Sequence, residues 1–302
     1  MHIPFIRKRR IFYLISAVLV GAAVFSILNF GLRLGIDFTG GSSLEVIFEN
    51  DVPSNASVKE KLEEIGLQKV TAQRAGEKGL ILKMGEITEE THQKVLEKLS
   101  ETGKIKEGSE SFRSIGPVVG EELKGKTKIV VSLALLAILL YIAFSFRRVS
   151  RPVKSYVYGL TSLLALGHDV LIPLGLFAIL GHFGEVEISI PIVTAFLTVF
   201  GYSINDSVVV FDRVRENLLK AGAPTFEETL EKSLNQSVRR SLFTSLTTLL
   251  VLFAIFFFGG ESLKYFSLAL IMGIGLGTYS SLFLATPLLV SFLRFKERKY
   301  KS

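Results

Sequence analysis

One hydrophobic stretch of the chain carries acidic chemistry inside it. The run from Ile188 to Phe211 is long enough to cross the ~30 Å hydrocarbon layer of a membrane as a helix, yet it contains Asn205 and Asp206, and Asp212 follows it directly. An ionised carboxylate inside a bilayer costs roughly 3 kcal/mol or more unless it faces a partner, a polar cavity or a proton. Two interpretations follow: a buried structural hydrogen bond, or a titrating group on the path of an ion or a proton. We favour the second.

The composition indicates a polytopic membrane protein. Of the 302 residues, 49% are hydrophobic, which exceeds what a single soluble core needs. The chain has no cysteine, which excludes disulfides, thiolate metal sites and a cysteine nucleophile.

The net charge of +7 does not indicate a nucleic-acid partner, because of where the basic residues stand. Lysine and arginine gather at both ends of the chain and in alternate loops, whereas the short opposite loops hold only Lys264. This asymmetry is the positive-inside pattern, so the basic charge reports topology and predicts that both termini lie in the cytoplasm.

Six apolar segments predict six membrane-spanning helices: 11–30, 129–146, 153–180, 188–211, 241–258 and 265–293. The first follows the basic start MHIPFIRKRR and is longer than the hydrophobic core of a signal peptide, so it predicts a membrane helix. A cleaved signal peptide is the alternative. Pro224 and Thr225, followed by two glutamates, predict a helix that starts there and lies along the inside surface before the fifth span.

The long polar segment between the first two spans has the pattern of a folded domain. Alternation predicts a strand over Ser43–Phe48, and an apolar stripe predicts a helix over Ser57–Ile65 that Ser57 caps. Strands at 69–74 and 80–84 flank a turn at Gly76–Gly79, and a helix over 88–100 and a last strand within 109–115 complete the order βαββαβ. This order predicts a ferredoxin-like α+β domain. The chain thus divides into 1–31 (N-terminus and first helix), 32–126 (an extracytoplasmic domain) and 127–302 (a five-helix membrane domain with a cytoplasmic C-terminus).

Polar side chains at helical spacing predict partners for the acidic residue. One side of the fourth span is expected to carry Thr198, Tyr202, Asn205, Asp206 and Val209, and the fifth span a stripe of Gln236, Arg240 and Thr244. If the two helices pack together, Arg240 is the natural counter-charge of Asp206, and making or breaking that pair would be a protonation switch. The alternative for Arg240 is a side chain that snorkels to the inside interface.

Other motifs leave two interpretations open. His168 and Asp169 in the third span are either members of a proton relay or a polar pair that holds helices together. Gly273, Gly275 and Gly277 in the last span predict close helix packing, as a static crossing rather than a sliding contact.

Three motifs resemble the SecF branch of the SecD/SecF family. They are LGIDFTGGSSLEV after the first span, SIGPVVGEEL before the second and GYSINDSVVVFDRVREN in the fourth. RRSLFTSLTTLL at the fifth span agrees, and the resemblance covers essentially the whole chain. It implies an α-helical polytopic membrane protein with six transmembrane helices of RND-like half-transporter type and a ferredoxin-like domain between helices 1 and 2.

The resemblance also implies a function. The chain would be a non-enzymatic subunit of the Sec machinery in the bacterial cytoplasmic membrane, where, with SecD, it would use the proton motive force to promote late translocation of preproteins from the SecYEG channel after SecA has acted. No cofactor or metal is implied, only a proton or sodium gradient; the partners are SecD, SecYEG with SecA, preproteins and membrane lipid, without nucleic acid. Asp206 and Arg240 would couple the proton, supported by the polar residues Asn205, Thr244, His168 and Asp169.

Two other function classes are weaker. An RND-type proton-coupled exporter of small solutes or lipids would find little room for a ligand channel in a single six-helix unit. An intramembrane aspartyl protease would use Asp169 and Asp206 as a dyad, but the chain lacks the Gly-x-Gly-Asp pattern of such enzymes.

Overall fold

The computed structural model describes residues 4–146, 153–184, 186–220 and 225–301. They form two compact units. The membrane unit comprises Met1–Arg33, Val130–Glu187 and Pro191–Ser302, and the outer unit comprises Leu34–Ile129 together with the short segment Ile188–Ile190.

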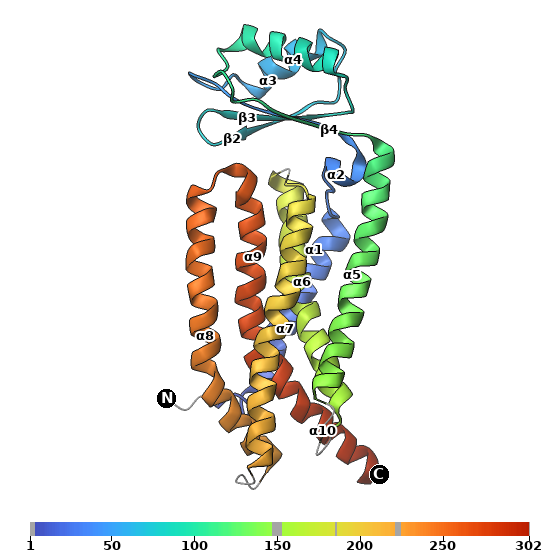
Figure 1. Ribbon diagram of the computed structural model, residues 1–302, viewed down its shortest axis with the longest axis vertical. Helices are drawn as coiled ribbons and strands as arrows, with labels where there is room; N and C mark the ends of the chain where they lie inside the picture. The colour runs from blue at the N-terminus through green and yellow to red at the C-terminus, as the bar shows by residue number, and fades with distance from the viewer. Residues whose placement is uncertain (1–3, 147–152, 185, 221–224, 302) are drawn as a thin grey trace. The chain divides into compact units, whose positions relative to one another are not determined.

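Six helices in the described part of the chain are long and apolar enough to cross a membrane. Five of the spans lie in single helices: α1 (Arg9–Phe30), α5 (Pro117–Ser145), α6 (Ser155–Gly184), α7 (Ile190–Leu219) and α8 (Phe226–Phe258) (Figure 1). The sixth lies in three consecutive elements: α9 (Glu261–Ser280), the π-helical turn η1 (Ser281–Ala285) and α10 (Thr286–Lys301). The six predicted spans are therefore confirmed.

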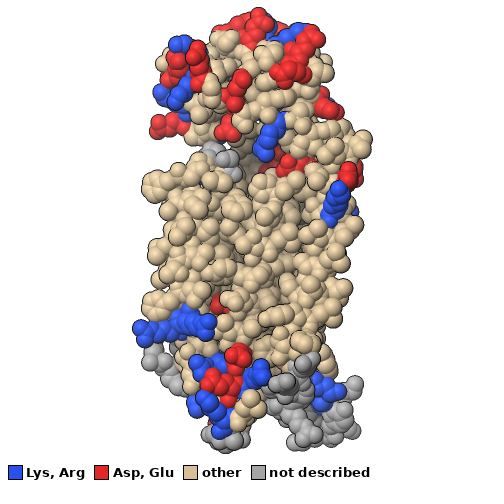
Figure 2. All heavy atoms as spheres, viewed as in Figure 1, with Lys and Arg blue, Asp and Glu red and all other residues tan. Residues whose placement is uncertain are grey.

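The membrane unit has a buried core that is mostly apolar and also exposes large apolar side chains on its surface. Large apolar side chains stay exposed on its outer helices, such as Leu14 on α1, Leu133 on α5 and Phe258 on α8. Figure 2 shows a broad band of mostly uncharged residues with lysine and arginine gathered at one end of this unit, which we call the basic end. Exposed apolar side chains in such a band are what a protein surrounded by the hydrocarbon of a bilayer is expected to have.

The predicted surface helix before the fifth span is wrong in its extent. Thr225 caps a helix as expected, since its side chain accepts the backbone N–H of Glu228, but that helix is α8 itself and continues without a break to Phe258. No proline or glycine interrupts residues 226–258, and a pair of arginines inside a helix does not end it.

The outer unit has the predicted βαββαβ order. Its elements are α2 (Ile36–Thr39), β1 (Gly41–Ile47), α3 (Asn55–Glu63), β2 (Thr71–Ala75), β3 (Gly79–Met84), α4 (Glu89–Thr102) and β4 (Ser111–Ile115). The strands form one antiparallel sheet in the order β2-β3-β1-β4, in which Leu44 of β1 pairs with Leu82 of β3 and Phe112 of β4. Leu44, Leu82 and Leu99 of α4 are fully buried in one core. The ferredoxin-like prediction is confirmed.

Two details of this unit differ from the sequence-based expectation or add to it. The cap of α3 is Ser54 and not the predicted Ser57. Ser54 has the extended backbone that a cap requires, and its side chain accepts the backbone N–H of Ser57. An exposed charge network joins α3 and α4: hydrogen bonds from Lys61 and Lys98 hold the pKa of Glu64 below its usual value.

The LGIDFTGGSSLEV motif binds the first residue of α7 within the outer unit. The N–H of Gly35 donates to the carbonyl of Ile188 at 2.8 Å, and Oδ2 of Asp37 accepts the N–H of Ile190 at 2.8 Å. Asp37 is only 7% exposed. Because the first N–H groups of a helix have no partner within it and carry partial positive charge, a buried carboxylate there stabilises the start of α7.

We expect Asp37→Ala to destabilise the folded chain by about 1 kcal/mol, since the N–H of Ile190 loses this partly buried acceptor. Asp37→Asn keeps an acceptor and should cost less. Thermal unfolding of the purified chain in detergent, followed by circular dichroism, measures the difference. Asp51→Ala removes an exposed carboxylate of the same unit and is the control. An unfolding temperature for Asp37→Ala equal to that of Asp51→Ala would contradict this role.

Candidate functional site

A fully buried carboxylate ties three membrane helices together. Asp169 of α6 accepts hydrogen bonds at Oδ2 from the hydroxyls of Ser203 on α7 at 2.6 Å and Ser280 on α9 at 2.7 Å. Its Oδ1 lies 2.9 Å from Nδ1 of His168. Asp169 is therefore surrounded by hydrogen-bonding groups on both oxygens, which is the condition for keeping a carboxylate inside a protein at tolerable cost.

A second buried carboxylate lies close by with much poorer partners. Asp206 of α7 is 5% exposed, and its Oδ2 has no hydrogen-bond partner among the residues that the structure describes. The hydroxyls of Ser241 on α8, Thr278 on α9 and Ser281 in η1 lie around it, and Asp169 is near enough to interact with it electrostatically. Removing an ionised oxygen from water without a full set of donors is costly, and taking up a proton removes that charge.

Further buried polar atoms of the membrane unit have no hydrogen-bond partner within the described part of the chain. They include Oγ of Ser207 and Ser241, which accompany Oδ2 of Asp206, and Nε2 of His168. Buried polar atoms in native proteins are nearly always hydrogen-bonded, so unpaired atoms at Asp206 and Ser241 single out this part of the membrane unit. The arrangement suits a site that exchanges a proton.

The π-helical turn η1 lies at this site. Its first residue, Ser281, lies beside Asp206, and Thr286 returns a hydrogen bond from its hydroxyl to the carbonyl of Ser281 at 3.1 Å. Single π-turns inside helices occur frequently at functional sites. The sequence analysis missed this turn; the signal available was the run of hydroxyl side chains ahead of Pro287, a residue that cannot donate a helical hydrogen bond.

Arg240 does not pair with Asp206 in this structure. The side chain of Arg240 is exposed and lines a cavity of about 80 Å³ together with Asp212, Glu216 and Gln236. The next residue, Ser241, faces Asp206 in its place. Consecutive residues of a helix point about 100° apart, so only one of these two neighbours faces the interior.

The predicted polar side of α7 is also divided. Asp206 is buried, whereas its neighbour Asn205 is exposed, as are Thr198 on the same helix and Thr244 on α8. The hydroxyl of Tyr202 connects the two helices by hydrogen bonds to Thr248 at 2.5 Å and to the carbonyl of Thr244 at 3.3 Å. Asn205 and Thr244 therefore do not contribute to the environment of the buried carboxylates, while His168 and Asp169, on α6, do.

Glycines of α9 allow the close approach that brings the site together. A Cβ at Gly273 would overlap Cγ2 of Val199 on α7, and one at Gly277 would lie 3.2 Å from Cβ of Ser203 and 3.5 Å from Oδ2 of Asp169. The predicted tight crossing is confirmed for these two positions, whereas a Cβ at Gly275 would meet nothing within 4 Å.

We expect Gly273→Ala to destabilise the membrane unit by roughly 1–3 kcal/mol, because its methyl group overlaps Val199. Gly275→Ala has space and gains helix propensity, so it should be neutral or stabilising. Thermal unfolding in detergent compares the two variants, and Val199→Ala in the Gly273→Ala background should restore part of the loss. Equal stability of the two glycine variants would refute the close crossing.

The chain is similar to proteins of one family along most of its length. The family model described as "Protein export membrane protein SecD/SecF, C-terminal" matches residues 94–295, and the SecD/SecF GG motif matches residues 25–52, which include Asp37. The protein translocase subunit SecF of Thermobaculum terrenum is 43% identical over 303 residues, covering 96% of this chain and 94% of that protein. SecF of Haemophilus influenzae is 38% identical, covering 93% and 83%.

Solved structures agree in fold. The crystal structure of SecDF, a translocon-associated membrane protein from Thermus thermophilus, matches 97% of this chain with a TM-score of 0.84 and 32% identity. A SecDF structure in a super-membrane-facing form matches with a TM-score of 0.69 and 33% identity. The chain spans 39% of the length of the first of these SecDF chains.

Proposed function

Because the chain belongs to the SecD/SecF family of protein export membrane proteins, we propose that it couples the proton motive force to the late translocation of preproteins. It is a multi-pass membrane protein whose relatives are named protein translocase subunits. The observation that carries the coupling is Asp206, a carboxylate buried within a membrane helix with one oxygen unpaired.

In the proposed mechanism the two carboxylates have different tasks. Asp169 keeps α6, α7 and α9 in register through Ser203 and Ser280 and stays in place. Asp206 alternately binds and releases a proton. The ionised form draws hydroxyl donors of α8 and η1 toward it and the neutral form releases them, so the packing of these elements against α7 changes with each proton. A membrane potential supplies ~2.3 kcal/mol per charge per 100 mV, enough to shift a balance between two packings.

Arg240 would take part in the proposed mechanism in a second conformation of α8, in which it faces Asp206. Its neighbour Ser241 occupies the place beside Asp206, so the guanidinium would reach the carboxylate only after α8 turns about its axis. Such a turn would replace a hydroxyl by a positive charge and eject the proton. Asn205 and Thr244, which are exposed, would then contact the partner protein rather than the proton.

The partners follow from the family. We propose that SecD supplies the remainder of the assembly that corresponds to the longer SecDF chain, and that the two act beside SecYEG after SecA has pushed the preprotein. The positive-inside pattern supports the proposal that both termini lie in the cytoplasm and the outer unit on the opposite side. The proposed role is non-enzymatic and needs no cofactor besides the ion gradient, with the proton ahead of sodium.

Asp206→Asn tests the coupling, because it keeps the size of the side chain and removes its proton exchange. In cells that depend on the chain, we expect the maturation rate of a secreted protein at a fixed proton gradient to fall to that of cells lacking it. The rate is read from pulse-labelled precursor and mature protein, and copurification with SecD checks assembly.

The matched control is Asp212→Asn, which removes an exposed carboxylate from the same helix. It should leave export near the unmodified rate. Unchanged export in a normally assembled Asp206→Asn variant would show that Asp206 is only a structural polar contact. Repeating the assay with a sodium gradient in place of the proton gradient identifies the coupling ion.

A further inference from the structure

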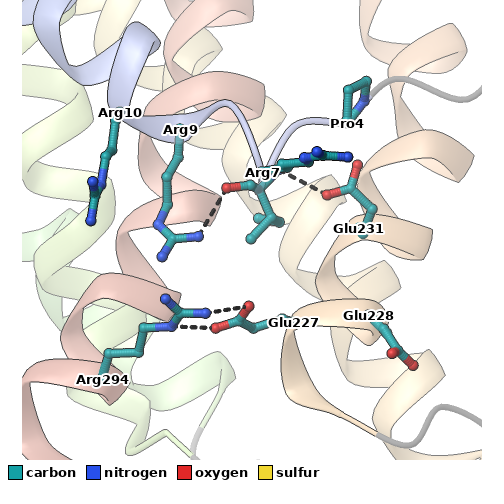
Figure 3. A pocket seen from close by; sticks show the side chains of 9 residues that line it. Pro4, Arg7, Arg9, Arg10, Glu227, Glu228, Glu231 and Arg294 are labelled. Carbon is teal, nitrogen blue, oxygen red and sulfur yellow. Dashed lines mark hydrogen bonds and ion pairs between the residues drawn. The ribbon is translucent and has the colours of Figure 1, made fainter.

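A cavity at the basic end of the membrane unit has no part in the proposed proton site. Its volume is about 580 Å³, and its walls come from the chain ahead of α1, from the first turn of α1, from the first turns of α8 and from α10. Four arginines and three glutamates line it (Figure 3). Four arginines against three glutamates give the lining a net formal charge of +1.

Two of the glutamates already have close partners. The carboxylate of Glu231 accepts the backbone N–H groups of Phe5 at 2.7 Å and Ile6 at 2.8 Å, which anchors the chain ahead of α1. The carboxylate of Glu227 holds Arg294 through two parallel hydrogen bonds, of 2.5 and 2.8 Å. Glu228 turns away from the arginines (Figure 3).

The three other arginines are not held in ion pairs by described residues. Among the residues that the structure describes, no carboxylate lies within ion-pair distance of Arg7, Arg9 or Arg10; Arg9 gives one N–H to the carbonyl of Ile6 at 2.9 Å. Arg9 and Arg294 point toward each other from opposite walls, and Arg10 extends beside Arg9 (Figure 3). Glu227 offsets the charge of Arg294, whereas the guanidinium groups of Arg9 and Arg10 repel each other unless an anion lies between them.

We propose that this cavity binds the phosphate group of an anionic phospholipid. Arginine forks match the paired oxygens of a phosphate better than any other side chain. The site is also placed for a lipid, because α1 begins at Arg9 and presents exposed Ile11, Leu14 and Val18 from its first turn onward, where acyl chains would lie. A soluble phosphate offers the same anion without those chains, and the experiment separates the two.

The test measures which lipid stays on the protein. The purified full chain is exchanged in detergent with equal amounts of phosphatidylglycerol and phosphatidylcholine, and native mass spectrometry counts the lipids retained. We expect one phosphatidylglycerol to be preferred, and Arg9→Gln with Arg10→Gln to lower that preference by roughly fivefold for each arginine removed. Lys232→Gln, which removes an exposed positive charge from α8 outside the cavity, should leave it unchanged.

A second variant keeps every basic residue and still tests the lipid site if the arginine variants insert poorly into the membrane. Glu227→Gln releases Arg294 from its ion pair and should raise the preference for phosphatidylglycerol. No preference in the unmodified chain, no change in Glu227→Gln, or equal losses with Lys232→Gln would overturn the proposal. Full displacement of the lipid by millimolar inorganic phosphate would assign the cavity to a soluble anion instead.

Discussion

The hydrogen bonds to Asp169 are the interaction on which the arrangement of the membrane helices depends. Lipid tails are as apolar as leucine, so packing between membrane helices is directed by close backbone approach and by polar contacts rather than by burial from water. Ser203 and Ser280 reach one carboxylate oxygen from two other helices. The lack of a side chain at Gly277 leaves space beside that same oxygen. Glycine and serine here are parts of one contact.

Asp206 shows what the same chemical group does without such support. Its surroundings supply hydroxyls from three elements, yet one oxygen stays unpaired, and buried serine hydroxyls beside it also lack partners. The two buried carboxylates thus differ in their partners: both oxygens of Asp169 have polar partners, and Oδ2 of Asp206 has none among the described residues. In the proposed mechanism this difference gives Asp169 the fixed role and Asp206 the titrating role.

The sequence predicted the parts of this protein that depend on local pattern. Apolar runs predicted the six spans, alternation and turn residues predicted the sheet, and the cost of a carboxylate in lipid singled out Asp206 and Asp169. What it did not predict depends on helix rotation and on contacts between distant segments. A turn of about 100° decides whether Arg240 or Ser241 faces the carboxylate, and a spacing of four residues cannot distinguish them. The hydrogen bond from Ile190 to Asp37 joins residues far apart in the chain and has no local signature.

The contact between Ile190 and Asp37 also limits how the chain can be divided into fragments that fold. The outer unit is not a simple insertion between the first two spans, since its fold includes Ile188–Ile190, which the chain reaches only after completing two further membrane crossings. Cutting the gene at the two ends of the sheet-bearing segment would yield a fragment with its glycine-rich loop open and Asp37 facing no helix end. Most of the outer unit is one continuous segment, but its fold also includes the start of α7. We therefore expect an exchange of outer units between relatives to preserve the fold only when the start of α7 is exchanged with them.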